Sequence, residues 1–156
     1  MCRVEDAEKL TISDAENAQK AILNLILQYS KFPNQFRATN KNVKWNSIEE
    51  GTSIGIFPLP GAKYIKRYIN GSYKAQMPFQ IVYRSSPGTN NDSIGSQEVL
   101  EELGSWLEKA GIEFKDKQME LESINRTSPV FSASQDVKKM DYAVNMQLKY
   151  IYKNGR

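Results

Sequence analysis

Residues 63–84 read KYIKRYINGSYKAQMPFQIVYR, and this stretch decides the fold that we predict for the chain. Asn70-Gly71 divides it, and this dipeptide tolerates the positive φ angles that a two-residue type I′ turn needs at both central positions. On either side of the turn, apolar and polar residues alternate with the period of a β-strand. The sequence therefore predicts a long hairpin in which Ile69 lies opposite Ser72.

The two faces of the predicted hairpin differ in character. One face, which we expect to be buried, contains the pairs Tyr68–Tyr73, Lys66–Ala75 and Tyr64–Met77, followed by Phe79, Ile81 and Tyr83. The opposite face is polar, and all its charges are basic. There Arg67 lies directly opposite Lys74, a like-charge pair that disfavours the sheet unless an acidic partner, salt or water screens it. Pro78 lacks a ladder donor, so we expect its strand to run along an edge or to carry a bulge.

The rest of the chain adds two helices, further strands and two long loops. An amphipathic helix is predicted over Asp14 to Ser30, after a capping box at Ser13-Asp14-Ala15-Glu16, and a second over Ser93 to Ala110. Alternation predicts these strands: Val43 to Trp45, Ser53 to Phe57, Met119 to Arg126 and Tyr142 to Tyr152. Turn-forming residues predict these loops: Ser85 to Asp92 and Ser128 to Lys138.

The order of these elements favours an α+β fold. It has no βαβ regularity and no internal repeat, which points to a mostly antiparallel sheet with a long central hairpin and two helices packed on one face. No linker-like stretch divides the chain, so residues 1–156 are predicted to form one domain, with residues 1–12 as a flexible N-terminal segment.

Composition removes several classes of enzyme. The 156 residues include no histidine and one cysteine, Cys2. Ser-His-Asp and Cys-His nucleophiles and His-ligated zinc are therefore excluded, which leaves carboxylate, lysine or tyrosine chemistry. Neither a GxGxxG nor a GxxxxGK[ST] phosphate loop occurs. We expect a non-enzymatic protein without a catalytic residue, metal or cofactor.

Nothing in the sequence indicates a membrane protein. No run approaches the roughly 18 apolar residues that span a bilayer. The first residues, Met1 to Asp6, include acids where a signal peptide would be basic. We expect a protein that stays in the cytoplasm in which it is made and has no membrane partner.

Three acids of the second predicted helix invite two interpretations. Glu98, Glu101 and Glu102 follow the i, i+3, i+4 spacing, so they share one side of the helix. There they can hold a cation or act as an acid/base pair. They can equally form the solvated face opposite the apolar stripe that packs on the sheet, which is the commoner layout of a helix.

The net charge of +3 hides two segments of opposite charge. Residues 61–84 hold five cations and no acid, and residues 85–113 hold six acids and one cation, so their net charges are +5 and −5. Such patches suit head-to-tail association of copies, but they also fit two solvated surfaces or neutralisation within one subunit. The interface hypothesis names these residues: Lys66, Arg67, Lys74 and Arg84 on the hairpin, and Asp92, Glu98, Glu101 and Glu102 on the acidic side.

Nucleic-acid binding by the basic hairpin is the alternative function. Single strands bind where aromatic side chains lie exposed beside cations. In the predicted register the tyrosines and most of the cations fall on opposite faces, which favours tyrosines in the core.

Residues 66–84 resemble the central hairpin of the minor capsid protein family of tailed bacteriophages of Gram-positive hosts. In that family a Tyr-Ile-x-Gly-Ser turn is followed by Gln-x-Pro-Phe and by a strand with an aromatic end. The helix through Leu103, Trp106 and Leu107 is similar too, as are residues 124–129 and 141–150, so the likeness covers most of residues 13–152. Members look like tail terminator, or tail completion, proteins: sandwiches of an antiparallel sheet and flanking helices.

The resemblance implies a structural role without catalysis. It implies a hexameric ring that caps the growing tail tube, stops its elongation at the correct length and offers the surface on which the head docks. The implied partners are further copies of the chain, the tail tube protein and head-completion or neck proteins, with DNA passing only transiently through the ring. The implied location is the tail or neck of the virion, after assembly in the host cytoplasm.

Overall fold

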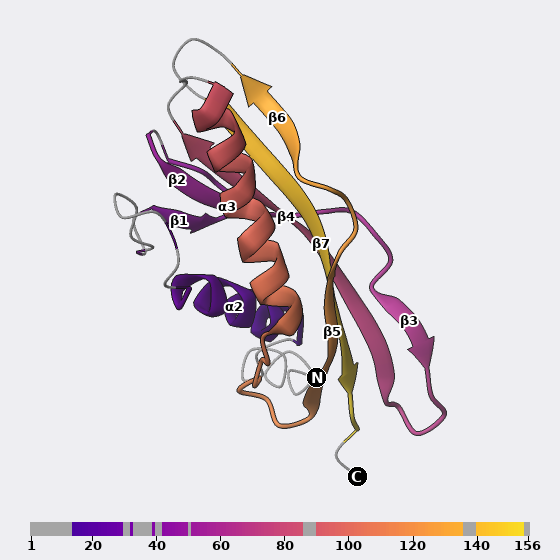
Figure 1. The fold of residues 1–156 in the computed structure, drawn as a ribbon. Helices are drawn as coiled ribbons and strands as arrows, with labels where there is room; N and C mark the ends of the chain where they lie inside the picture. The colour runs from indigo at the N-terminus through magenta and orange to yellow at the C-terminus, as the bar shows by residue number, and fades with distance from the viewer. Residues whose placement is uncertain are drawn as a thin grey trace, which may run out of the picture.

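The computed structural model describes residues 14–29, 32, 39, 42–49, 51–85, 90–135 and 140–154, without the side chains of 90–93, 134 and 135. These ranges form two helices and one seven-stranded sheet (Figure 1). The helices are α2 (Asp14–Leu27) and α3 (Asn90–Lys109). The strands are β1 (Val43–Trp45), β2 (Ser53–Pro58), β3 (Tyr64–Arg67), β4 (Tyr73–Ser85), β5 (Met119–Arg126), β6 (Phe131–Gln135) and β7 (Met140–Tyr152).

Two long antiparallel strands, β4 and β7, form the middle of the sheet. They pair along their whole length, from Tyr73 opposite Tyr152 to Ser85 opposite Met140. The strand order is β1-β2-β4-β7-β5, with β3 on β4 beyond the end of β2 and β6 on β7 beyond the end of β5. Only the β1–β2 pair is parallel among the described strands. The predicted α+β fold with a mostly antiparallel sheet is confirmed.

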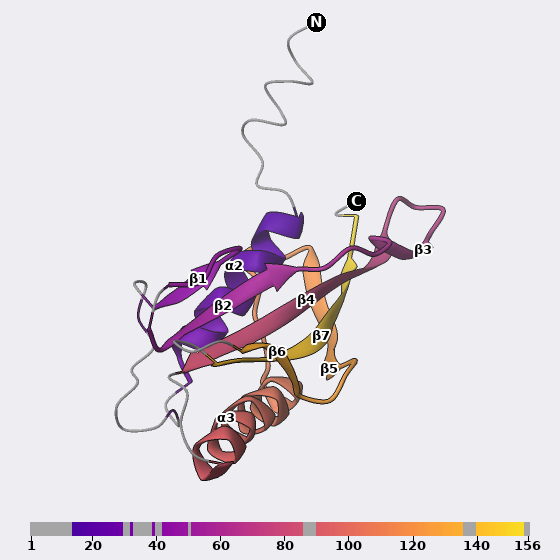
Figure 2. The ribbon, with the colours of Figure 1, turned by 90° about the horizontal axis from the view of Figure 1, so that it is seen from above.

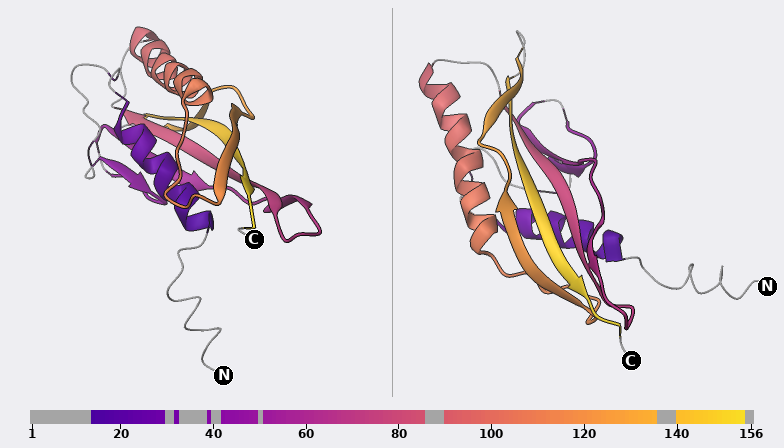
Figure 3. Two further views of the ribbon diagram at one scale, coloured as in Figure 1. Left: turned by 90° about the horizontal axis from the view of Figure 1, so that it is seen from below. Right: turned by 90° about the vertical axis from the view of Figure 1, so that its right-hand side faces the viewer.

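Both helices pack on the same face of the sheet, as predicted (Figure 3). Alternating residues of β4 and β7 point toward them, and the largest of these, Phe79 and Tyr150, are almost fully buried. The helices meet each other where the Tyr29 ring lies 5.1 Å from the Trp106 ring, centroid to centroid. The buried helical residues on this face are Ala18, Ile22, Leu25 and Ile26 of α2 and Leu100, Leu103 and Leu107 of α3.

The helix boundaries differ from the prediction by more than one residue at two places. The first helix ends at Leu27, earlier than the predicted Ser30, which lies outside the described residues. The second begins at Asn90 instead of Ser93, so Asn90 to Asp92 form its first turn and not the end of a loop. Asn and Asp favour turns and helix starts alike, because their side chains bond nearby backbone amides. Ser13 and residues 1–12 also lie outside the described residues.

The turn of the central hairpin is one residue longer than predicted. The amide of Tyr68 donates to the Ser72 carbonyl at 2.8 Å, and the amide of Gly71 donates to the Tyr68 carbonyl at 3.1 Å. Gly71 has φ +90°, whereas Asn70 does not have a positive φ. This is a three-residue loop that combines a type I turn with a glycine bulge, and it needs one positive φ instead of two.

The longer turn shifts the register of the hairpin by one residue. Lys66, and not Arg67, lies opposite Lys74, and a bulge follows between Lys66 and Tyr64. The buried face was predicted correctly for most of β4, but it was wrong for β3, whose residues are all exposed. Neither helix covers this end of the ribbon, and Tyr64 and Tyr68 are each 40% exposed.

Pro78 does not put its strand at an edge, because β4 pairs on both sides. The proline lies where the neighbour changes: β2 ends with Pro58 opposite Phe79, and β3 begins only at the residue pair Tyr64 and Ala75. The carbonyl of Pro78 accepts a bond from Leu59 on that side, at 3.0 Å. The N–H that proline lacks thus falls between the ends of β2 and β3, where β4 has no paired residue on that side, so no ladder hydrogen bond is lost.

Strand β6 replaces part of the predicted loop from Ser128 to Lys138. Phe131 lies opposite Ala143 and Ser132 opposite Tyr142, and a bulge precedes the pairing of Ser134 with Asp141. The segment Phe131–Gln135 has little apolar alternation, so its own sequence gives no strand pattern. It forms a strand by completing the free edge of β7.

Candidate functional site

The hairpin of β3 and β4 projects beyond the helices and ends in exposed apolar residues (Figure 2). Ile69, at the turn, is fully exposed, and Ile65 is 44% exposed. The exposed large hydrophobic residues of the described chain are Tyr64, Ile65, Tyr68, Ile69 and Ile94, so four of the five lie on this hairpin. We call Tyr64 to Ile69 the hairpin tip. An apolar cluster of this kind on a monomer marks a surface for interaction.

Two cations of the hairpin tip rest on its tyrosine rings. The guanidinium carbon of Arg67 lies 3.9 Å from the Tyr64 ring centroid, and Nζ of Lys66 lies 5.3 Å from that of Tyr68. Within the described part of the chain, neither cation has a carboxylate within ion-pair distance. Stacking on a ring orients a cation without neutralising it, so the tip carries two charges available to a partner.

The other two predicted basic residues are engaged inside the chain. Lys74 donates to Glu122 at 2.6 Å, and this hydrogen bond raises the pKa of Lys74. Arg84 forms a bidentate pair with Asp141, at 2.8 and 2.9 Å, and donates to the Glu49 carbonyl at 3.1 Å. The side chains of Arg84 and Asp141 are only 13% and 7% exposed, so this pair belongs to the interior of the sheet end.

The predicted acids lie on α3. Glu98, Glu101 and Glu102 are exposed, as a solvated helix face requires. Asp92 is in the first turn of α3, and its side chain lies outside the described residues. Among the residues with described placement, no group of three or more acids or cysteines is arranged to hold a metal ion. The cation-site interpretation therefore has no geometric support there.

A hollow beside α3 brings two of these acids together with aromatic side chains. It has a volume of about 630 Å³ and lies where the end of α2, the second half of α3 and the end of β5 meet. Burial, with the charge of Glu102 as a second cause, raises the pKa of Tyr29 at its edge. Its lining residues are Tyr29, Glu101, Glu102, Ser105, Trp106, Lys109 and Arg126, which we call the α3 hollow.

A buried carboxylate fixes the base of the hairpin. Asp14, the first residue of α2, accepts hydrogen bonds from the hydroxyls of Tyr73 and Tyr150, both at 2.7 Å, and from Nζ of Lys63 at 3.0 Å. Burial acts to raise the pKa of Asp14, but the three hydrogen bonds and the positive charge of Lys63 outweigh it, and the pKa lies below its ordinary value. Burial and the Asp14 charge raise the pKa of both tyrosines.

Stacked rings extend this anchor toward the tip. Tyr73 stacks on Tyr152 and meets Tyr64 edge to face, each pair at 5.0 Å between centroids. The hairpin thus leaves the body on a rigid base and becomes exposed beyond it. The sequence placed Asp14 only at the start of a predicted helix and did not indicate this role, because the partners of its carboxylate lie 49 to 136 positions away.

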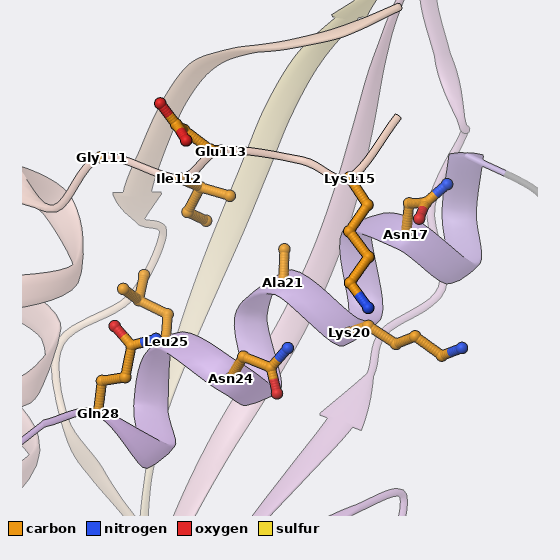
Figure 4. A pocket seen from close by; sticks show the side chains of 10 residues that line it. All are labelled: Asn17, Lys20, Ala21, Asn24, Leu25, Gln28, Gly111, Ile112, Glu113 and Lys115. Carbon is orange, nitrogen blue, oxygen red and sulfur yellow. The ribbon is translucent and has the colours of Figure 1, made fainter. Parts of the chain in front are cut away.

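A second hollow lies between α2 and the segment that joins α3 to β5 (Figure 4). Its volume is about 370 Å³. Ile112 and Leu25 point toward its middle, and Lys20 and Lys115 lie toward the start of α2. Amide side chains supply most of the remaining polar atoms, and Glu113 is its one carboxylate. This set offers neither paired carboxylates nor a charge cluster, so its chemistry does not indicate a reaction.

Comparison with known proteins does not assign the chain to a family. No family profile matches the sequence, and no curated protein matches it. One solved structure, whose name states no function, covers 91% of this chain over 94% of its own length, with 16% identity and a TM-score of 0.47. A likeness at this level carries no argument about function. No helix in the described part of the chain is long and apolar enough to cross a membrane.

Proposed function

We propose that the chain is a structural assembly protein of a phage tail: a terminator subunit that forms a ring on the tail tube, stops its elongation and receives the head. The observation that supports this most is the projecting hairpin tip, which exposes four large apolar residues and two cations without a carboxylate partner among the described residues. A monomeric protein gains nothing in stability from such a tip, whereas a ring subunit uses it to reach a neighbour.

The sequence resemblance to phage minor capsid proteins gives this association its biological setting. Two of the stretches that carry the resemblance, residues 66–84 and 141–150, lie in the parts of the fold that build and expose the hairpin: the end of β3, the turn, β4 and β7, on which β4 pairs. The other residues that carry it lie on α3 and at the end of β5. The ring would meet tube protein on one side and neck proteins on the other, and it would act in the virion.

Deletion of the gene tests the proposal. Without a terminator, tubes continue to grow, so electron microscopy should find headless tails of uncontrolled length and full heads without tails. Expression of the intact chain from a plasmid should restore one tail length. Tails of normal length that carry heads in the deletion strain would refute the proposed function.

One observation favours a second candidate, the binding of single-stranded nucleic acid. The predicted separation of tyrosines and cations does not hold on β3, where Tyr64 and Tyr68 lie exposed beside Arg67 and Lys66. Exposed rings with adjacent cations are the elements of a stacking platform. Fluorescence anisotropy with a labelled single-stranded oligonucleotide tests it: a platform gives salt-sensitive binding that Tyr64→Ala and Tyr68→Ala abolish. A lack of binding at low salt would remove this candidate.

A further inference from the structure

We infer that the hairpin tip of one copy inserts into the α3 hollow of a second copy. This inference rests on the proposed function, since it names the contact by which ring subunits would join. The tip brings apolar residues and two cations, and the hollow brings aromatic walls and two carboxylates. The two surfaces are complementary in both respects.

The two surfaces carry charges of opposite sign that are available to a partner. Lys66 and Arg67 on the tip, like Glu101 and Glu102 at the hollow, have no ion-pair partner among the described residues. Among the cations of the hollow, Arg126 binds Glu108 at 2.9 Å, whereas Lys109 is exposed and has no ion-pair partner among the described residues. Two carboxylates against this one unpaired cation leave the hollow with a net negative charge, opposite to that of the tip.

The apolar parts also correspond. Ile69 stands fully exposed at the turn of the tip, and Trp106 at the hollow is only half-buried. Burial of an isoleucine against an indole ring removes apolar surface of both from water, which is the main source of affinity in such contacts. Lys66 and Arg67 would then lie at the rim, where Glu101 and Glu102 are exposed.

The positions of the two surfaces require that the contact form between copies. Figure 2 shows β3 at one end of the molecule and α3 at the opposite end, so a tip cannot reach the hollow of its own chain. Used head to tail, this contact is heterologous, and it repeats from copy to copy until it closes a ring or grows as a filament. A two-fold dimer that exchanges its tips would pair the same surfaces, so cross-linked species larger than a dimer are the mark of the head-to-tail arrangement that a ring needs.

Charge reversal on each surface separately tests the contact. In the tip variant, Lys66→Glu and Arg67→Glu place acids against the acidic hollow. In the hollow variant, Glu101→Lys and Glu102→Lys place cations against the basic tip. Each variant alone should lose self-association, but a mixture of the two should regain it, because every tip then meets a hollow of opposite charge. The matched control for the tip variant is Lys20→Glu with Lys117→Glu, which makes the same change in net charge on exposed residues away from both surfaces.

A cross-link traps the contact as it forms, so the yield of joined chains reports how often tip and hollow meet. With Cys2→Ser, the pair Asn70→Cys and Ser105→Cys places one thiol beside Ile69 and one at the hollow. A short bismaleimide then joins them between copies while Ile69 stays in place. Multimer bands should appear for this chain and for the control in the same background. They should fall about tenfold in either reversal variant, a loss of about 1.4 kcal/mol in contact free energy, and should return in the mixture.

Each result decides the matter. No multimer with the Asn70→Cys and Ser105→Cys chain, or equal yields from the tip variant, the hollow variant and the control, would overturn the inferred contact. Circular dichroism of each variant shows whether it remains folded, and recovery in the mixture cannot come from unfolded chains. Cross-linked multimers together with normal tails in the deletion strain would leave the contact standing and refute the proposed function. Overgrown tails in the deletion strain without cross-linked multimers would support the proposed function and overturn the inferred contact.

Discussion

Replacement of Asp14 should be the most damaging single change at the base of the hairpin. One oxygen of its carboxylate accepts hydrogen bonds from both Tyr73 and Tyr150, at 2.7 Å each. Asp14 is 9% exposed and Tyr150 is 1% exposed, so water cannot take the place of the carboxylate at Tyr150. Asp14→Ala leaves two tyrosyl hydroxyls without an acceptor.

The magnitude follows from these contacts. A buried donor that loses its acceptor costs about 1–3 kcal/mol, and a hydrogen bond to a charged group contributes about 1.5–3 kcal/mol. The pair with Lys63 adds little, because that lysine is 37% exposed and is screened by solvent. We therefore expect Asp14→Ala to lower the free energy of unfolding by about 2–4 kcal/mol, and Asp14→Asn, which keeps one acceptor, by less.

Urea denaturation followed by the fluorescence of the two tryptophans measures this loss. Glu16→Ala is the matched control, since this exposed acid of the same helix makes an i,i+4 pair with Lys20 and should cost less than about 0.5 kcal/mol. Tyr150→Phe should cost much less in the Asp14→Ala background than in the intact chain. If Asp14→Ala costs under about 1 kcal/mol, or if the two changes are additive, the carboxylate does not fix the hairpin as we describe.

Three further outcomes test other parts of the structure. The pKa of folded Asp14 lies below its unfolded value, so its contribution to stability is complete above about pH 4 and is lost as the pH falls through the folded pKa. In acid titrations, the difference in unfolding free energy between the intact chain and Asp14→Asn should therefore shrink below about pH 4. In urea melts, Gly71→Ala should destabilise the chain by about 1–2 kcal/mol, because φ is +90° and the added methyl would lie 2.7 Å from the side-chain nitrogen of Asn154. Gly95→Ala in helix α3 should instead stabilise it by about 0.5–1 kcal/mol, because the added methyl meets nothing within 4 Å. Arg84→Ala should cost about 3–5 kcal/mol because it leaves Asp141 buried and unpaired, and thermal melts in which Arg84→Ala with Asp141→Ala is no more stable than Arg84→Ala alone would contradict this.

The sequence predicted those parts of the fold that a strong local pattern specifies. Strand β5 has the predicted bounds, and β7 begins only two residues before the predicted Tyr142, because its alternation continues over many residues. Strand β6 was missed because its pairing depends on the free edge of β7 and not on its own residues. The hairpin was expected but its turn was wrong, since Asn-Gly suits a longer loop with one positive φ as well as a type I′ turn.

The candidate site was predictable in part, for a similar reason. Segment charges identified the basic hairpin and the acidic helix, but not which charges are already neutralised. Lys74 pairs with a residue 48 positions away and Arg84 with one 57 positions away, both outside the acidic segment. Long-range pairing therefore removes Lys74 and Arg84 from the eight candidate interface residues. The exposed strand β3 places apolar residues next to the two remaining cations, Lys66 and Arg67.

Tail length in a complemented deletion strain tests the central claim most directly, namely that copies of this chain join through tip and hollow to terminate a tail. The intact chain should give one length. The tip variant, Lys66→Glu with Arg67→Glu, and the hollow variant, Glu101→Lys with Glu102→Lys, should each give overgrown headless tails, and their co-expression should restore the single length. Normal tails from either variant alone would contradict the account.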